Sequence, residues 1–227
     1  MRFGQWSLRS GFSLGFLALF CASMTGAMLS YAGGSWLNPH STSHAFFENF
    51  WCDLLREPAH NGLPNRRSVL LGTVGFAALA LALAPFWLEV SRLLSAGRAR
   101  FVRVAGVVSA IATAVVALMP SDRFPRLHAP AVLTAGSLGF VCGWLVSSWA
   151  LRHFRSVPGF ALSALVLVVA AAVNLVLYIK VAYFVPSETI VLPAAQKIAS
   201  IALVFWMVAG LRAARPLDSS TPRPLDP

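Results

Sequence analysis

Residues 68–90 read SVLLGTVGFAALALALAPFWLEV, and the only charged side chain among them is Glu89, next to the end of the run. A helix needs about 20 apolar residues to cross the roughly 30 Å hydrocarbon core of a bilayer. A lone segment in lipid must satisfy its backbone hydrogen bonds internally, which leaves helix as its only conformation. This run is therefore a predicted transmembrane helix.

Five more apolar runs of comparable length flank it, so the predicted fold is all-α, an integral membrane bundle of six transmembrane helices within residues 1–215. The five runs are Gly11–Ala32, Phe101–Met119, Ala129–Ala150, Gly159–Val185 and Pro193–Leu211. Residues 216–227 are rich in Pro, Ser and Asp, which predicts a disordered cytoplasmic tail.

The composition excludes an ordinary soluble domain, because 57% of the residues are hydrophobic and only 11% are charged. Soluble domains carry about 25% charged residues. The net charge of +10 does not indicate nucleic-acid binding, since the basic residues sit in short clusters between apolar runs rather than on one water-facing surface.

The arginines predict the orientation of the bundle. The N-terminus, the second and fourth connections and the C-terminus hold eleven of them, against five on the other side. Cytoplasmic loops are enriched in Arg and Lys, so both termini are expected in the cytoplasm, most simply of a bacterial inner membrane. The first run exceeds the 7–15 residues of a usual signal-peptide core. We therefore expect it to be retained, although cleavage remains an alternative.

The first outer connection, Gly33–Arg67, is long and contains an amphipathic pattern. Within Ser43–Glu57, apolar side chains recur at helical spacing and form one stripe: Phe46, Phe47, Phe50, Trp51, Leu54 and Leu55. The dense Phe and Trp content predicts an interfacial helix lying in the headgroup region. Such a helix either caps the bundle or acts as a lid that contacts lipid.

Polar residues of the outer side supply the candidate site. Asp53, Asp122 and His128 are predicted to converge at the outer mouth, because the Pro120–Pro125 turn ties Asp122 to His128 and the predicted helix carries Asp53 back over the bundle. An Asp and a His placed there can act as acid and base. A structural polar cluster is the alternative interpretation. No metal site and no cofactor is predicted. His44, Asn49 and Asn65 in the long connection are candidate binding residues.

Lys180 is a further candidate, because an ionisable residue within a span marks a site by default. It lies toward the outer end of its span, where its side chain can reach the interface, with Glu188 or Asp53 as a partner. No carboxylate lies in the middle of a span, which disfavours a proton-coupled transporter.

The segment His44-Ala-Phe-Phe-Glu-Asn-Phe-Trp-Cys-Asp53-Leu54, followed by Asn61-Gly62, Asn65 and the Pro120-Ser121-Asp122…His128 turn, resembles bacterial six-span proteins of unknown function. These are similar to the DRAM/FRAG/SFK-like group. The resemblance implies a six-helix membrane fold and draws attention to Asp53, Asp122 and His128. The eukaryotic members of the group are associated with lipid handling, and the bacterial members have no settled activity. Where the group often has Ser-Asp-Leu-Gly, this chain has Cys52-Asp53-Leu54-Leu55.

The leading hypothesis is a multi-pass membrane protein, not itself an enzyme, that engages membrane lipid, a membrane protein partner or a second copy of itself. Two alternatives stay open. One is a membrane-embedded hydrolase or lipid-modifying enzyme with an Asp/His site at the outer surface. The other is a transporter of small solutes.

Overall fold

The computed structural model describes residues 7–184 and 190–215, and every regular element in these ranges is helical. Six of the helices are long and apolar enough to cross a membrane: α1 Leu8–Leu29, α2 Arg66–Val90, α3 Ala96–Leu118, α4 Pro125–Arg152, α5 Pro158–Ile179 and α6 Val191–Ala213. The predicted fold class is confirmed. The predicted tail, Glu188 and the end of the fifth run at Val185 lie outside the described residues.

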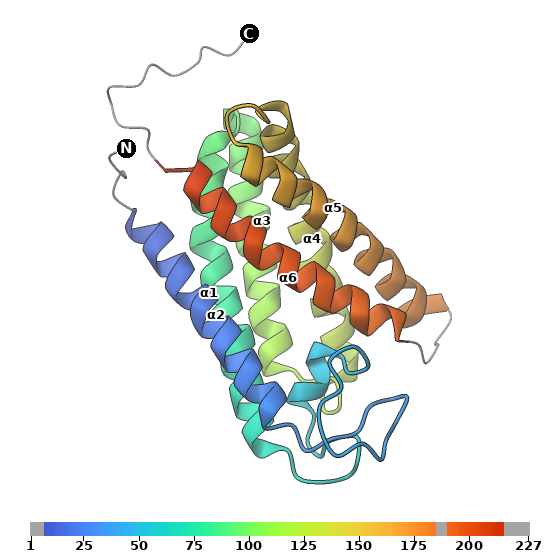
Figure 1. Cartoon of the computed structure of the whole chain (residues 1–227). Coiled ribbons are helices and arrows are strands. Elements are labelled where there is room, and N and C mark those ends of the chain that lie inside the picture. Colours follow the sequence, from blue (N-terminus) through green and yellow to red (C-terminus); the bar gives the residue numbers. More distant parts are fainter. Residues whose placement is uncertain (1–6, 185–189, 216–227) are drawn as a thin grey trace.

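Consecutive helices pack against each other, and α6 closes the bundle against α2 and α1 (Figure 1). The two ends of the described chain lie at one end of the bundle. The long loop, residues 30–65, lies at the opposite end together with the α3–α4 turn (Figure 1). One side of the bundle therefore carries almost all of the chain that is not helical.

The helices differ from the predicted spans mainly at their polar ends. The fourth begins at Pro125 rather than Ala129, because proline suits the first helical turn, where its missing N–H leaves no bond unmade. The third begins at Ala96 and so includes Arg98 and Arg100. The fifth ends at Ile179, earlier than predicted, and a π-helical turn over Lys180–Phe184 follows it.

Small residues allow the helices to approach closely, as is usual where lipid provides no hydrophobic drive between helices. A Cβ atom on Gly75 would meet the Met24 side chain of α1, and one on Gly106 would overlap the Trp87 ring of α2. The Ser13 hydroxyl donates to the Ala82 carbonyl at 2.8 Å and joins α1 to α2. Glycine and serine thus set the contacts of the first three helices.

The predicted interfacial helix over Ser43–Glu57 is present only as one 3-10 helix, η1, Trp51–Leu55. A continuous α-helix would direct the N–H groups of Phe50 and Trp51 to carbonyls four residues earlier. The Phe50 N–H instead donates to Asp53 Oδ2 at 2.8 Å, and the Trp51 N–H donates to Gln196 Oε1 of α6 at 2.9 Å. Side-chain acceptors have replaced the helical ones.

The apolar stripe of the long loop is divided in consequence. Trp51, Leu54 and Leu55 are buried against the bundle, whereas Phe47 is 51% exposed. At the entrance to the loop Gly33 and Gly34 adopt positive φ angles and pass so close to residues 41–42 and 60–61 that neither position has room for a Cβ atom. The loop is a folded lid rather than a helix lying on lipid.

Candidate functional site

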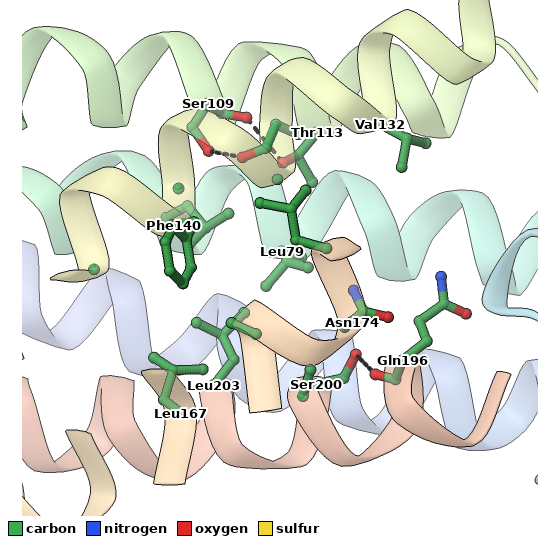
Figure 2. A pocket seen from close by; sticks show the side chains of 18 of the residues that line it. Leu79, Ser109, Thr113, Val132, Phe140, Leu167, Asn174, Gln196, Ser200 and Leu203 are labelled. Atoms are coloured by element: carbon green, nitrogen blue, oxygen red, sulfur yellow. Dashed lines mark hydrogen bonds between the residues drawn. The ribbon is translucent and has the colours of Figure 1, made fainter. Parts of the chain in front are cut away.

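A partly open cavity of about 260 Å³ lies between α2, α3, α4, α5 and α6 (Figure 2). Its walls are mostly apolar, and no Asp, Glu, Lys, Arg or His of the described residues lines it. Ligand pockets in proteins are typically concave and lined by apolar side chains with a few polar groups. The cavity therefore suits an apolar ligand better than an ion or a polar solute.

The end of the cavity away from the long loop is aromatic. Trp87 of α2 and Trp206 of α6 both line it, and their ring centroids are 5.8 Å apart. Phe86 packs behind them, 5.0 Å from Trp206 and 5.1 Å from Trp87. This cluster is almost fully buried, and the indole N–H groups of Trp87 and Trp206 have no hydrogen-bond partner within the described residues.

The α4 wall is made of glycine at the positions where the cavity is open. Gly143 is buried and lines the cavity, and a Cβ atom placed on it would meet no atom within 4 Å. Gly139 instead packs on α3, where its Cβ would lie 3.1 Å from the Ser109 hydroxyl. Of these two glycines, only Gly139 makes a close contact with a neighbouring helix.

The end of the cavity nearest the long loop is polar. Gln196 and Ser200 of α6 and Asn174 of α5 contribute to its wall (Figure 2). Cys52 of the loop lines the cavity as well. The Trp51 indole N–H donates to the Ser200 hydroxyl at 2.9 Å, so the loop is docked onto this end. Asn174 Oδ1 is buried and has no hydrogen-bond partner within the described ranges.

Cys52 is in contact with His128 at the start of α4. The Cys52 Sγ and His128 Nε2 atoms are 3.1 Å apart, and His128 Nδ1 lies 2.7 Å from the Met119 carbonyl oxygen. Burial and the adjacent Asp53 carboxylate raise the pKa of the Cys52 thiol to about 12, which the Lys197 ammonium partly offsets. The thiol is therefore protonated at neutral pH.

Asp53 lies in a separate network inside the loop. Its Oδ2 accepts from the Asn49 side-chain amide at 3.1 Å and from the Phe50 N–H, and its Oδ1 lies 3.0 Å from His60 Nε2. Asn49 is fully buried and also donates to the Gly34 carbonyl at 2.8 Å. These bonds hold the two halves of the loop together.

Lys197 of α6 connects this network to the bundle. Its ammonium is completely buried and donates to the Asn49 carbonyl at 2.6 Å. It also lies 4.3 Å from the Trp51 ring centroid and 5.7 Å from that of Phe46, both within the roughly 6 Å range of a cation–π contact. The loop thus surrounds one buried cation.

The predicted convergence of Asp53, Asp122 and His128 takes a different form. Asp122 accepts from the Glu57 N–H at 3.2 Å and His128 contacts Cys52, so both residues hold the α3–α4 turn to the long loop. Asp53 has no hydrogen bond to either of them in the described parts of the chain. Its neighbour Cys52 makes the contact.

The other predicted binding residues have structural contacts or lie apart. Asn65 binds the Ala32 N–H and the Arg56 carbonyl and so closes the base of the loop. His44 is packed between Tyr31 and Phe46, and burial together with the Lys197 charge lowers the pKa of its imidazole to about 4. Lys180 is exposed at the end of α5 and does not line the cavity.

The sequence prediction did not select Cys52, Gln196 or Lys197 as site residues. The available signal was Lys197, an ionisable residue within the sixth span, and Gln196 beside it. Among the described residues, no group of three or more His, Cys, Asp or Glu side chains is placed to hold a metal ion.

No family model matches this chain, and searches among curated proteins and among solved structures find no match to it. The chemistry of the cavity and the long loop is therefore the basis for assigning a function.

Proposed function

We propose that this multi-pass membrane protein binds one apolar chain of a membrane lipid in its internal cavity, with the polar end of the ligand under the long loop. The observation that carries the proposal is the polarity of the cavity: Trp87 and Trp206 form one end, and Asn174, Gln196 and Ser200 line the other. A lipid has the same division between an apolar chain and a polar end.

The unpaired polar group at the loop end supports this assignment. A buried donor or acceptor without a partner costs about 1–3 kcal/mol. The Asn174 oxygen is in that situation, and a small shift of its side chain toward a ligand hydroxyl or amide would satisfy it. The resemblance to the DRAM/FRAG/SFK-like group, whose eukaryotic members are associated with lipid handling, is consistent with the proposal.

A cavity-filling variant tests the proposal. Gly143→Leu places a four-carbon side chain in open cavity space without meeting a neighbour at Cβ. The matched control is Gly15→Leu, since Gly15 is exposed on α1 and a Cβ there also meets nothing within 4 Å. The purified proteins are titrated with the fluorescent fatty acid cis-parinaric acid in detergent.

We expect Gly143→Leu to weaken binding by at least about tenfold, or about 1.4 kcal/mol, and Gly15→Leu to leave it unchanged. Equal affinity in wild type and Gly143→Leu would reject the cavity as the binding site. Equal loss in both variants would indicate a general effect on the bundle and would also contradict the proposal.

The orientation belongs to the same proposal: the arginine bias places both termini in the cytoplasm and the long loop outside. In a background without the native cysteines, a membrane-impermeant maleimide should label Leu63→Cys in intact cells. It should label Ser95→Cys only after lysis. The opposite pattern would reverse the orientation.

A further inference from the structure

The contact between Cys52 and His128 has the arrangement of a nucleophile and its base. A backbone carbonyl only accepts hydrogen bonds, so the 2.7 Å contact to the Met119 oxygen requires a proton on His128 Nδ1. The neutral ring then presents the lone pair of Nε2 to the Cys52 thiol, 3.1 Å away. A nucleophile bonded to a base that a third group orients is the general signature of covalent catalysis.

The position of Cys52 relative to the cavity indicates the kind of substrate on which Cys52 and His128 would act. Cys52 lies on the wall of the cavity at its polar end. A lipid whose acyl chain fills the cavity would place its first polar group beside Cys52. Gln196 lies on the same wall, and the Trp51 N–H fixes its amide oxygen. The Gln196 amino group is thus left to donate to a ligand, and its hydrogens have no protein acceptor within the described residues.

We propose that Cys52 is an acyl-accepting nucleophile and His128 its general base, in an acyl-transfer reaction on an ester-linked membrane lipid whose acyl chain occupies the cavity. This inference rests on the proposed function, because the cavity must hold the chain before the thiol can reach its carbonyl carbon. It assigns the substrate class, an acyl ester, and the two residues that act on it.

The proposed acyl transfer has two stages, acylation of Cys52 and release of the acyl group. His128 Nε2 takes the thiol proton while Cys52 Sγ bonds to the ester carbonyl carbon, and the resulting oxyanion accepts a hydrogen bond from an amide such as Gln196. The ester C–O bond then breaks, the leaving alkoxide takes the proton from Nε2, and a thioester remains. Water or a second lipid hydroxyl, deprotonated by His128, attacks the thioester. The C–S bond breaks, and the thiolate recovers the proton.

The test uses full-length protein in detergent with Cys21→Ser and Cys142→Ser, which leaves Cys52 as the one thiol of the chain. The probe is p-nitrophenyl decanoate, which releases p-nitrophenolate when its acyl group is transferred. We expect a burst of p-nitrophenolate and one decanoyl adduct by intact mass, removed by neutral hydroxylamine. A protein in which Cys142 is the only cysteine is the control, since that thiol lies in the bundle with a backbone carbonyl as its partner.

Two variants assign the roles. Cys52→Ser should form no hydroxylamine-labile adduct, and His128→Gln should slow adduct formation about 100-fold or more, the usual contribution of a general base. Absence of an adduct on the single-cysteine protein would overturn the proposal without the need for any further variant. An unchanged rate in His128→Gln would overturn the role of His128.

Lipid binding separates this inference from the function on which it rests. The protein with Cys52 as its one thiol should bind cis-parinaric acid as the wild type does, because neither Cys21 nor Cys142 lines the cavity. Normal binding without acylation would reject the acyl transfer alone. Loss of binding in Gly143→Leu together with loss of the adduct would support both.

Discussion

The two ends of the bundle each bury one charged side chain completely, Lys197 under the long loop and Glu89 at the opposite end. Glu89 Oε1 accepts from Arg92 Nη1 at 2.9 Å, three residues further along the chain. Lys197 donates to the Asn49 carbonyl, 148 residues away in sequence. The Glu89 pair is made by neighbours in sequence, and the Lys197 contact forms only when the loop has docked on α6.

This difference means that the loop end should respond more strongly to single substitutions than the opposite end. Each residue there holds several elements together, so removal of one exposes others. At the opposite end, Glu89 has a local partner, a half-exposed arginine that water can replace. Four experiments, from the largest expected effect to the smallest, test this difference.

Trp51→Ala should have the largest effect. The residue is 8% exposed, donates to Ser200 and lies under the Lys197 ammonium, so its removal leaves a cavity and a less well-held charge. We expect a loss of about 3–5 kcal/mol in the free energy of unfolding, typical for truncation of a buried Trp. Thermal unfolding in detergent measures it. Phe47→Ala, at an exposed position of the same loop, should change stability by less than about 1 kcal/mol.

Asn65→Ala tests the base of the loop. The change leaves the Ala32 N–H and the Arg56 carbonyl without the partners that Asn65 supplies. A cost of about 2 kcal/mol is expected for these buried groups. The same unfolding assay applies, with the exposed Asn38→Ala as control. A stable Asn65→Ala protein that lost binding of cis-parinaric acid would instead make Asn65 a binding residue.

Arg92→Ala tests the opposite end. Glu89 loses its partner there, but the Arg92 side chain is 52% exposed, which lets water reach the vacated position. We expect a loss of about 1.5 kcal/mol, the low end for a hydrogen bond to a buried charged group because Arg92 itself is half exposed, with binding of cis-parinaric acid unaffected. The exposed Arg98→Ala is the control. If Arg92→Ala cost as much as Trp51→Ala, the proposed contrast between the two ends would be wrong.

His44 gives the loop end a pH dependence of its own. Its pKa is lowered to about 4 by burial first and by Lys197 second, and Asp53 acts in the opposite direction. The unfolded chain, with a His pKa of about 6.5, binds more protons between these values, so this residue's contribution to stability is complete above pH 6.5 and is lost as the pH falls toward 4.

Wild type and His44→Phe should therefore differ in how the unfolding midpoint changes between pH 7 and pH 4.5. The wild type should lose more stability on acidification, since the ring that must stay neutral is absent from the variant. Parallel pH profiles would show that His44 does not titrate in the folded loop.

The contrast between the two ends also explains what the sequence could predict. The spans follow from composition and length, which act within each run, so all six were found and mainly their polar ends were displaced. The prediction of a helix over Ser43–Glu57 was wrong. The spacing of the apolar residues from Phe46 to Leu55 is helical, but Asp53 and Gln196 accept hydrogen bonds from backbone N–H groups that a helix would bond internally. Gln196 lies in α6, 145 residues from Trp51, and no local pattern reports that contact.

The candidate site shows the same limit. Asp122 and His128 were expected near the long loop because the short α3–α4 turn keeps them together, and both contact it. Asp53 and Cys52 are adjacent in sequence, and only the direction of each side chain in η1 decides which of them meets His128. The cavity depends on five helices at once, so no single span of the sequence indicated it.

Native mass spectrometry of the protein extracted gently from its own membranes tests the central claim most directly. The account predicts one lipid molecule retained by the wild type and by Gly15→Leu, and little or none by Gly143→Leu, because only the last fills the cavity. Retention of the same lipid by Gly143→Leu, or no retained lipid in any of the three proteins, would contradict a lipid chain held inside the bundle.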